Sequence, residues 1–335
     1  MCDPPPVHTI SRRGRSASVA AARNARRSLR FDEGVTTVVA DPPDERVAGH
    51  FGDPYREQRS LAAGDGVVDL SHRDVLRISG PERLAFLHSL LTQHVEHLQP
   101  GTSVEALILS PQGHVEHHLH LTETGTEVLA HTEPGDGAAV RDFLDRMRFL
   151  MRVEIAAVDD QWVRWEHGAY QLGDRAEGSV GMVALEALRI AQGTPRLHLD
   201  TDHRTLPHEV GWLGSAVHLD KGCYRGQESV ARVYNLGRPP RRLVKLHLDG
   251  SDSALPARGA DVTLEGRAVG RMGSSARHFE EGPIGLALLK RQVPPEAALV
   301  VDGIAASIEL LPDTVPESPA RAAADARSGL LKHRG

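Results

Sequence analysis

The hydrophobic periodicity of this chain changes near Leu243, and this change limits the folds that the chain can adopt. Upstream, segments with apolar residues at helical spacing are mixed with short strand-like runs. From Leu243 onward, apolar and polar residues alternate, as in Val244, Leu246 and Leu248, and glycine turns separate the runs. Further short strands are predicted at 262–264, 268–271, 284–288 and 305–310. The sequence therefore predicts an α+β body followed by a small β-barrel.

Within the body, amphipathic helices and strands are predicted in mixed order. A helix should begin near Pro81, because proline is favoured at the first helical position, and two more helices are predicted at 136–148 and 183–191. Strands are predicted at 67–70, 75–78, 104–109, 115–121 and 153–158. A turn at 110–113 separates two of these strands, which should therefore form a hairpin.

The two ends of the chain differ from the rest in composition. Residues 1–45 combine prolines with Ser, Arg and Ala repeats, which predicts a disordered Arg-rich tail, although such starts are also typical of organellar transit peptides. Residues 313–335 return to Pro, Ala and Arg and are predicted to be mobile. Between these tails, 46–240 is assigned to the α+β body and 241–312 to the barrel.

Charge, hydropathy and cysteine content exclude several classes of function. The chain of 335 residues has a net charge of −6, although its first thirty residues are strongly basic, so the body is acidic and is not expected to bind nucleic acid. No apolar run reaches the about 18 residues that cross a bilayer, so no membrane association is expected. Two cysteines, one of them Cys2, exclude a disulfide framework and favour a cytoplasmic location.

The strongest candidate for chemistry is the octapeptide 221–228, Lys-Gly-Cys-Tyr-Arg-Gly-Gln-Glu, followed by Arg232. Its Cys223 lies between cationic side chains that favour the thiolate, so the thiol is expected to be a nucleophile, a transient metal ligand or a carrier. A helix starting after Gly226 would place its amino end near the thiol. The predicted site residues here are Cys223, Lys221, Tyr224, Gln227, Glu228 and Arg232. Glu228 could equally serve the start of that helix.

The octapeptide resembles the signature of the YgfZ-type folate-binding proteins, which are relatives of the glycine-cleavage aminomethyltransferase (T-protein) and assist iron–sulfur protein maturation. Further similarity lies at 69–72, 78–81 and 188–193, and the resemblance covers roughly 60–311. It implies a cloverleaf of two α+β lobes and a C-terminal β-barrel around a folate channel, with 46–240 as the aminomethyltransferase-like region. It also implies tetrahydrofolate, or a one-carbon derivative, as the cofactor.

The sequence departs from the T-protein at two positions that the resemblance makes important. Where aminomethyltransferases have a pair of aspartates, one of them catalytic, this chain has His117 and His118, which argues against glycine-cleavage activity. The pattern that helps to seat the pterin ring is present as Arg189 but has Ala191 in place of its glutamate. The predicted folate contacts are His117, His118, Arg189, Glu209, Arg241 and Arg242. The two last arginines belong to a cationic strip, 221–242, that would suit the anionic glutamate tail.

The histidine-rich segment 114–120 and the number of cysteines bear on metal and iron–sulfur cluster binding. His114, Glu116, His118 and His120 would share one face of a strand, but alternation spreads them along it, so no metal site is predicted. Because an iron–sulfur cluster normally takes four thiolates, cysteines of this chain alone cannot house one. Any role in iron–sulfur chemistry would therefore consist in assisting another protein.

The function predicted from these features is that of a folate-binding accessory protein supporting iron–sulfur cluster assembly or repair. Its expected partners are the folate and iron–sulfur client or assembly proteins. Two alternatives stay open: a folate-dependent one-carbon (aminomethyl-type) transferase, and a tRNA-modification helper that acts through iron–sulfur modifying enzymes or through its Arg-rich tail. Whether the chain is an enzyme is left undecided.

Overall fold

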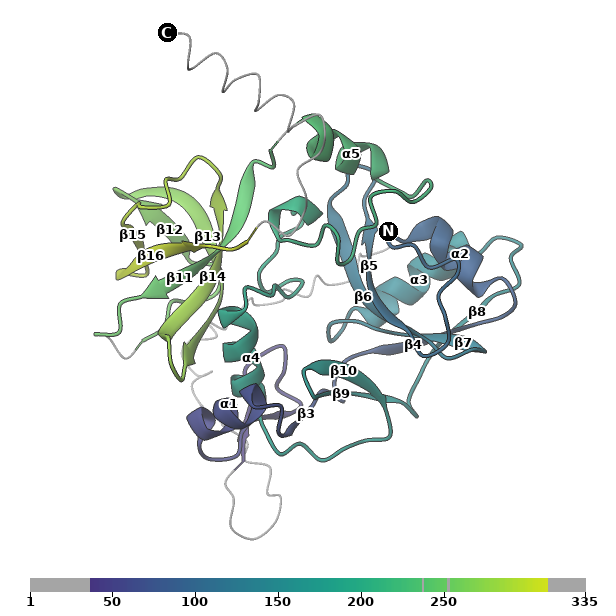
Figure 1. Cartoon of the computed structure of the whole chain (residues 1–335), viewed down its shortest axis with the longest axis horizontal. Coiled ribbons are helices and arrows are strands. Elements are labelled where there is room, and N and C mark those ends of the chain that lie inside the picture. Colours follow the sequence, from purple (N-terminus) through teal and green to yellow (C-terminus); the bar gives the residue numbers. More distant parts are fainter. Residues whose placement is uncertain (1–36, 237, 252–253, 313–335) are drawn as a thin grey trace, which may run out of the picture.

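The computed structural model describes residues 37–236, 238–251 and 254–312. The predicted tail 313–335, and the part of the predicted N-terminal tail before residue 37, lie outside the described residues. Three bodies surround a shared centre (Figure 1). They are a five-stranded sheet with two helices, a smaller layer built on the N-terminal segment, and a β-barrel.

The first body is an antiparallel sheet with strand order β5-β6-β7-β4-β8. Its strands are β4 (Val75–Ser79), β5 (Ser103–Leu109), β6 (Val115–Glu123), β7 (Glu127–His131) and β8 (Glu154–Ala157). The helices α2 (Arg83–Leu90) and α3 (Gly137–Met147) contribute apolar side chains to one core with this sheet, among them Phe86 and Leu144. The opposite face of the sheet is left for other contacts.

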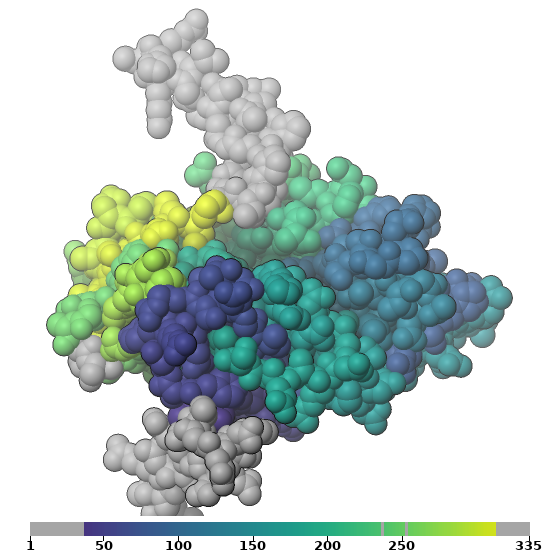
Figure 2. Space-filling model, turned by 60° about the horizontal axis from the view of Figure 1, so that its bottom comes forward, coloured from purple at the N-terminus to yellow at the C-terminus, as the bar shows by residue number. Residues whose placement is uncertain are grey.

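The second body contains a three-stranded sheet of order β10-β9-β3. Its elements are β3 (Val67–Asp69), β9 (Trp162–Glu166), β10 (Ala169–Gly173), α1 (Pro54–Ala62) and α4 (Met182–Ala191), together with the pair β1 (Val38–Val39) and β2 (Ala48–His50). Gln58 of α1 ties this body to the barrel: its side chain donates to the Arg277 carbonyl at 2.9 Å and accepts from the Phe279 amide at 2.9 Å. In Figure 2 the purple N-terminal segment fills the surface between the barrel and the teal region.

The third body is a closed barrel of order β11-β14-β13-β12-β15-β16. Its strands are β11 (Arg241–Leu248), β12 (Asp261–Leu264), β13 (Arg267–His278), β14 (Gly282–Lys290), β15 (Leu299–Val301) and β16 (Ile304–Leu310). The alternation seen at Val244, Leu246 and Leu248 places these three side chains inside the structure. The predicted α+β body with a C-terminal barrel is confirmed.

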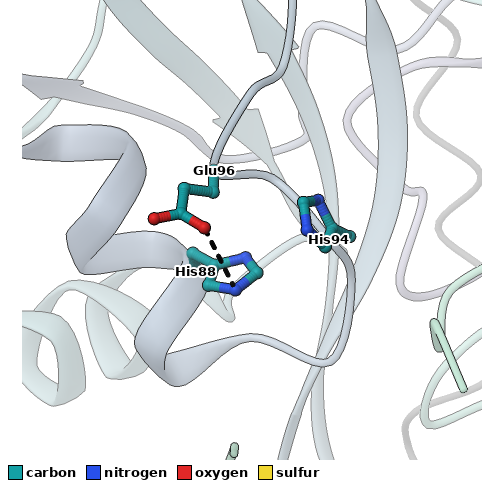
Figure 3. A group of neighbouring side chains, drawn as sticks. All are labelled: His88, His94 and Glu96. Atoms are coloured by element: carbon teal, nitrogen blue, oxygen red, sulfur yellow. Dashed lines mark ion pairs between the residues drawn. The ribbon is translucent and has the colours of Figure 1, made fainter. Parts of the chain in front are cut away.

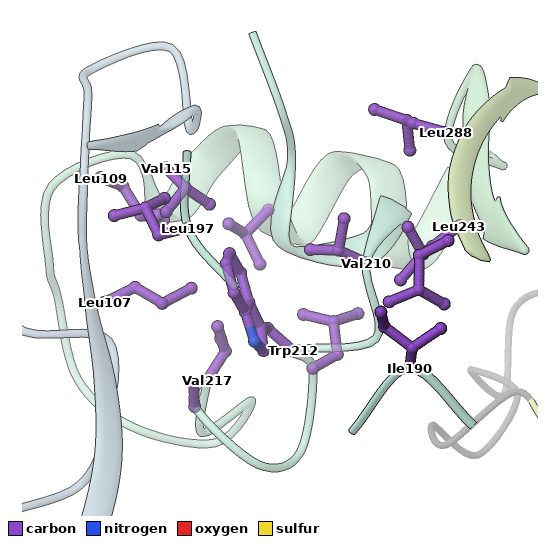
Figure 4. Packing of buried hydrophobic residues seen from close by; sticks show 14 of the residues in the cluster. Leu107, Leu109, Val115, Ile190, Leu197, Val210, Trp212, Val217, Leu243 and Leu288 are labelled. Atoms are coloured by element: carbon purple, nitrogen blue, oxygen red, sulfur yellow. The ribbon is translucent and has the colours of Figure 1, made fainter. Parts of the chain in front are cut away.

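A central core joins the bodies around Trp212 (Figure 4). Leu107 comes from the first sheet, Ile190 from α4 and Leu288 from the barrel, and all are buried in this cluster. Two short elements complete the junction, the 3-10 helix η1 (Pro207–Glu209) and α5 (Gln227–Leu236). Because this core contains side chains from all three parts of the fold, it fixes the bodies against one another.

Residues 37–45 differ from the predicted disordered tail. Val38–Val39 forms a strand, and Asp44 is 4% exposed. The carboxylate of Asp44 is paired with Arg196, which lies 152 positions later in the chain. Local composition predicted disorder because a partner so distant leaves no trace in the neighbouring sequence.

Candidate functional site

The octapeptide lies on a loop that Lys221 anchors to the carboxyl end of α2. Lys221 is 5% exposed, and its ammonium donates to the carbonyls of His88, at the end of α2, and Leu91, the latter at 2.5 Å. Desolvation by burial lowers the pKa of Lys221 to about 8. The lysine predicted to tune the thiol is therefore directed at backbone carbonyls of another segment.

Tyr224 is a second anchor of this loop. Its ring belongs to the central core, is 8% exposed and lies beneath the Lys221 ammonium, 5.3 Å from the ring centroid. Burial raises the pKa of Tyr224 to about 12. Tyr224 therefore holds the loop on the core, and a role in proton transfer near neutral pH does not follow from its surroundings.

Two glycines let the loop rest directly on the β5–β6 turn. Gly226 has φ +82°, and a Cβ atom there would lie 2.6 Å from the carbonyl oxygen of Ser110. The facing Gly113 has φ +83°, and its Cβ would lie 2.8 Å from the Cβ of Ser229. Only residues without a side chain permit this approach of backbone to backbone. The hairpin turn thus sets the position of the loop and the start of α5.

The remaining octapeptide residues lie nearer the surface. Cys223 is exposed and is a free thiol. Arg225 pairs with Glu116 of β6 at 2.8 Å, and the Gln227 side chain donates to the Lys221 carbonyl at 3.3 Å, closing the loop on itself. Arg232 and Glu228 form an exposed ion pair with each other at 3.0 Å on α5. The loop therefore has a fixed base and presents Cys223 outward.

A second cluster lies on the face of the first sheet opposite α2 and α3. His118 Nε2 is 3.2 Å from Glu105 Oε2, and the His118 ring packs 4.7 Å from that of Trp212. Burial alone would raise the pKa of Glu105, but the hydrogen bond with His118 and the nearby His120 lower it to about 2. Glu105 is therefore an ionised carboxylate, placed beside His118 from the neighbouring strand.

Aromatic rings extend this cluster toward the second body. The rings of His120 and His131 are stacked with centroids 4.6 Å apart, and Tyr170 of β10 lies 4.5 Å from His120. Burial lowers the pKa of both histidines well below the usual range, so both are neutral near pH 7. Glu105, His120, His131 and Tyr170 line a cavity of about 350 Å³, large enough for a small ring system.

The predicted folate contacts do not meet at one place. His117 points to the other face of the sheet, where its Nδ1 atom lies 3.6 Å from the Asp136 carboxylate. His117 and Arg241 both line a different cavity of about 730 Å³. Arg241 is paired with Asp202 at 2.6 Å and with Glu209 at 2.7 Å, so the structure brings together two of the predicted residues but neutralises the arginine. The Arg242 side chain donates to the Val293 carbonyl at 2.7 Å.

Arg189 is also engaged within the protein. It is 7% exposed and binds Glu186 at 2.5 Å and Asp200 at 2.8 Å. Within the cationic strip expected from the sequence, Arg225, Arg232 and Arg241 are likewise paired with carboxylates. The sequence suggested unpaired positive charge at this strip because the carboxylates that pair with it come mostly from distant segments.

Glu105 and Tyr170 were not predicted as site residues from the sequence, and His120 and His131 were considered only as members of a histidine-rich strand pattern. One signal was available: Glu105 and His120 occupy facing strands of the predicted hairpin, at opposed positions in the observed register. Tyr170 gave no such signal, because its strand was not predicted.

Comparison with known proteins is consistent with this architecture. Residues 241–317 match the family described as CAF17, C-terminal beta-barrel domain. The glycine cleavage system aminomethyltransferase T from Bartonella henselae has a similar structure, with a TM-score of 0.65 and 16% identity, covering 83% of this chain and 92% of that one. The fold is therefore that of the T-protein, with a closed six-stranded barrel at the C-terminal end.

Several curated proteins are similar in sequence, over a smaller part of this chain than the structural match covers. A chloroplastic protein of Arabidopsis thaliana, named as a candidate transferase, is 25% identical over 287 residues, 68% of this chain and 65% of its own length. An aminomethyltransferase of Rippkaea orientalis is 26% identical, over 65% of this chain and 76% of that protein. The mitochondrial iron–sulfur cluster assembly factor IBA57 homolog of Phaeosphaeria nodorum is 24% identical, over 58% of this chain and 59% of its own. The chain thus spans less than two thirds of the first and third of these relatives.

Proposed function

We propose that this protein binds tetrahydrofolate or a one-carbon derivative in the cavity of about 350 Å³ and supports iron–sulfur cluster assembly or repair through the thiol of Cys223. The observation that carries the proposal is that the carboxylate of Glu105 and the rings of His120, His131 and Tyr170 line one cavity. This is the YgfZ-type role expected from the octapeptide, with the folate contacts moved from the predicted arginines to this cavity.

The donor set of the cavity fits a pterin. The amide and amino edge of a pterin carries adjacent N–H donors, and a carboxylate such as Glu105 accepts two parallel hydrogen bonds. The flat ring would lie against the imidazoles of His120 and His131 and the phenol of Tyr170. The His131 Nδ1 atom is buried without a hydrogen-bond partner in the described structure, so it offers an additional polar contact.

The accessory role rests on two further features. Cys223 is exposed on a rigidly anchored loop, a position accessible to another protein. One relative is named as an iron–sulfur cluster assembly factor homolog. With one thiol among its described residues, the chain would act on clusters held by client proteins rather than hold one by its own cysteines.

Calorimetry with tetrahydrofolate under anaerobic, reducing conditions tests the cavity. Glu105→Gln should weaken binding by about 10- to 100-fold, because a hydrogen-bonding charge is removed. Glu154→Gln on the exposed edge strand β8 is the matched control and should bind as the wild type does. Cys223→Ser should also retain binding. Equal affinity of Glu105→Gln and the wild type would disprove folate binding in this cavity.

The role of the thiol is tested separately, in cells of the source organism that lack the gene. Activities of enzymes with [4Fe–4S] clusters should be restored by the wild type and not by Cys223→Ser at equal protein level. Full restoration by Cys223→Ser would exclude the thiol from the function, whatever the result with folate.

A one-carbon transferase is the second candidate, and one contact favours it. Glu105 supplies a carboxylate beside His118, one of the two positions where the T-protein pattern has aspartates. A carboxylate next to an imidazole can hold or move a proton near a bound amine. Release of formaldehyde or transfer to ammonia from 5,10-methylene-tetrahydrofolate, lost in Glu105→Gln, would support this activity over a purely accessory role.

A further inference from the structure

A cluster of metal-ligand side chains lies at the carboxyl end of α2, outside both sites described above. His88 is in the last turn of the helix, and His94 and Glu96 follow in the next loop (Figure 3). One donor atom from each residue lies within 4.8 Å of the other two. His88 Nε2 and Glu96 Oε2 are 3.9 Å apart. The three donors therefore converge on one point, unlike the histidines spread along β6.

More imidazoles surround this point. The His94 ring centroid lies 4.7 Å from that of His88, 5.4 Å from that of His218 and 6.1 Å from that of His97. The Nδ1 atom of His88 is buried and has no hydrogen-bond partner in the described part of the chain. Nε2, on the other side of the ring, is the nitrogen that faces Glu96, so Nδ1 would carry the proton of the neutral imidazole while Nε2 binds a metal ion.

The loop that carries His94 and Glu96 is fixed to the loop that carries Cys223. The Thr92 side chain donates to the Ala216 carbonyl at 2.7 Å, and the His218 amide donates to the Thr92 carbonyl at 3.0 Å. Lys221 binds the carbonyls of His88 and Leu91. One residue, Gly222, separates Lys221 from Cys223, so their Cα atoms are at most about 7 Å apart. The histidine cluster is thus built into the support of the thiol loop.

We propose that His88, His94 and Glu96 form a binding site for a divalent transition metal of the Zn²⁺ type, next to the Cys223 loop. Imidazole and carboxylate donors together select such ions over Mg²⁺ and Ca²⁺, which prefer oxygen ligands alone. Three protein ligands leave at least one coordination position open to water or to a donor from a partner protein. His97 and His218 are close enough to His94 to serve as alternative ligands when the loop adjusts.

The charges around the cluster determine how tightly the site would hold a metal ion. Two neutral imidazoles and one carboxylate reduce the charge of a divalent ion to +1. The ammonium of Lys221 lies nearby on the His88 carbonyl and opposes a further cation. The site is therefore an exchangeable one, weaker than a closed structural zinc site with four protein ligands.

The test is a titration of the full chain, without an affinity tag and freed of metal by a chelator, with Zn²⁺ and Co²⁺. The wild type should bind one more equivalent of Zn²⁺ than the double variant His94→Asn/Glu96→Gln. In the wild type, bound Co²⁺ should give the intense visible absorption of a low-coordinate site, and the double variant should lose it. Both substitutions are on exposed side chains, so the fold should be retained, which the melting temperature checks.

Two other groups of metal-ligand side chains serve as controls, each changed singly in a chain that keeps His94 and Glu96. They are Glu105 with His118 and His120, and His247 with Glu281 and Glu309. The variants Glu105→Gln and His247→Asn should keep the equivalent that His94→Asn/Glu96→Gln loses. Loss of this equivalent in either control, or unchanged stoichiometry and spectrum in the double variant, would overturn the proposal. Folate binding, measured on the same double variant, should be unaffected, so this proposal and the proposed function can fail independently.

Discussion

Arg196 forms a bidentate ion pair with Asp44, and this pair joins segments that are 152 residues apart in the chain. Its two terminal nitrogens donate to the two carboxylate oxygens of Asp44 at 2.8 and 2.9 Å. Both side chains are almost completely buried. The pair fastens the N-terminal segment onto the loop that follows α4, so the N-terminal residues 37–45 are part of the folded structure.

This pair is one part of a buried network at the junction of the bodies. Arg196 also binds Glu133, after β7, at 2.6 Å and Glu186 of α4 at 2.8 Å. Glu186 binds Arg189, whose guanidinium donates in turn to Ser274 Oγ of the barrel strand β13 at 2.5 Å. Because each buried charge has several opposite partners, the network compensates for the loss of hydration.

The first prediction concerns the removal of Arg196. Arg196→Gln removes a charged partner from each of the buried carboxylates of Asp44 and Glu133, and should lower the free energy of unfolding by about 3–5 kcal/mol. Urea denaturation followed by circular dichroism measures this change. Arg152→Gln is the control: Arg152 pairs with Glu82 on the surface, with 73% of its side chain exposed, and should cost less than about 1 kcal/mol. Similar losses for the two variants would contradict a central role for the network.

The second prediction is that stability falls with decreasing pH, and begins to fall near pH 6.5. Burial lowers the pKa of His120 and His131 in the folded state, so the unfolded chain takes up these protons first as the pH drops below about 6.5. Stability that is present above this pH is therefore lost below it, by up to about 1.4 kcal/mol per pH unit and proton. His131→Phe removes one of these protons and should flatten the decline between pH 6.5 and 5 in urea titrations. A wild-type stability that is constant over this interval would contradict the prediction.

The third prediction extends the pH dependence to the carboxylates. Burial alone would raise the pKa of Glu133, but the charges of Arg73 and Arg196 lower it to about 2. A lowered pKa in the folded state means that the stability contributed by this group is complete above about pH 4.5 and is lost as the pH falls toward 2. A second loss of stability is therefore expected below pH 4.5. Thermal melts at closely spaced pH values should resolve it, and its persistence in His131→Phe would separate it from the histidine effect.

Much of the fold could be predicted because local patterns determine it. The hairpin of β5 and β6 was predicted from alternating apolar residues around the turn at 110–113, and α3 from its apolar stripe. The hairpin of β9 and β10 and the helix α1 were missed. In β9 and β10 most side chains are only partly buried, so their sequence lacks a clear alternation.

The octapeptide was identified from the sequence, whereas the partners of its side chains were not. Cys223 and the start of α5 follow from neighbouring residues. In contrast, Lys221 binds carbonyls 130 and 133 residues away, and Arg225 binds a carboxylate 109 residues away. Charge counted along the sequence predicted a cationic strip, because pairs formed by the tertiary fold do not appear in such a count.

The last prediction separates the two glycines of the octapeptide. Gly226→Ala places a Cβ atom 2.6 Å from the Ser110 carbonyl at a residue with φ +82°, so both strain and contact oppose it. It should lower the free energy of unfolding by at least about 1–2 kcal/mol. At Gly222 no atom lies within 4 Å of an added Cβ, so Gly222→Ala should change stability by less than about 0.5 kcal/mol.

The same pair of variants also distinguishes support of the loop from access to the thiol. If Gly226 serves only to seat the loop on the β5–β6 turn, Gly226→Ala should also make Cys223 react differently with a neutral alkylating reagent, because the loop must shift. Gly222→Ala adds a methyl group next to the thiol without moving the loop, and should slow alkylation only slightly. Equal stability of the two variants would show that the close approach of Gly226 to the turn is not needed, and that the side-chain contacts of the loop, such as those of Lys221 and Tyr224, are enough to hold it.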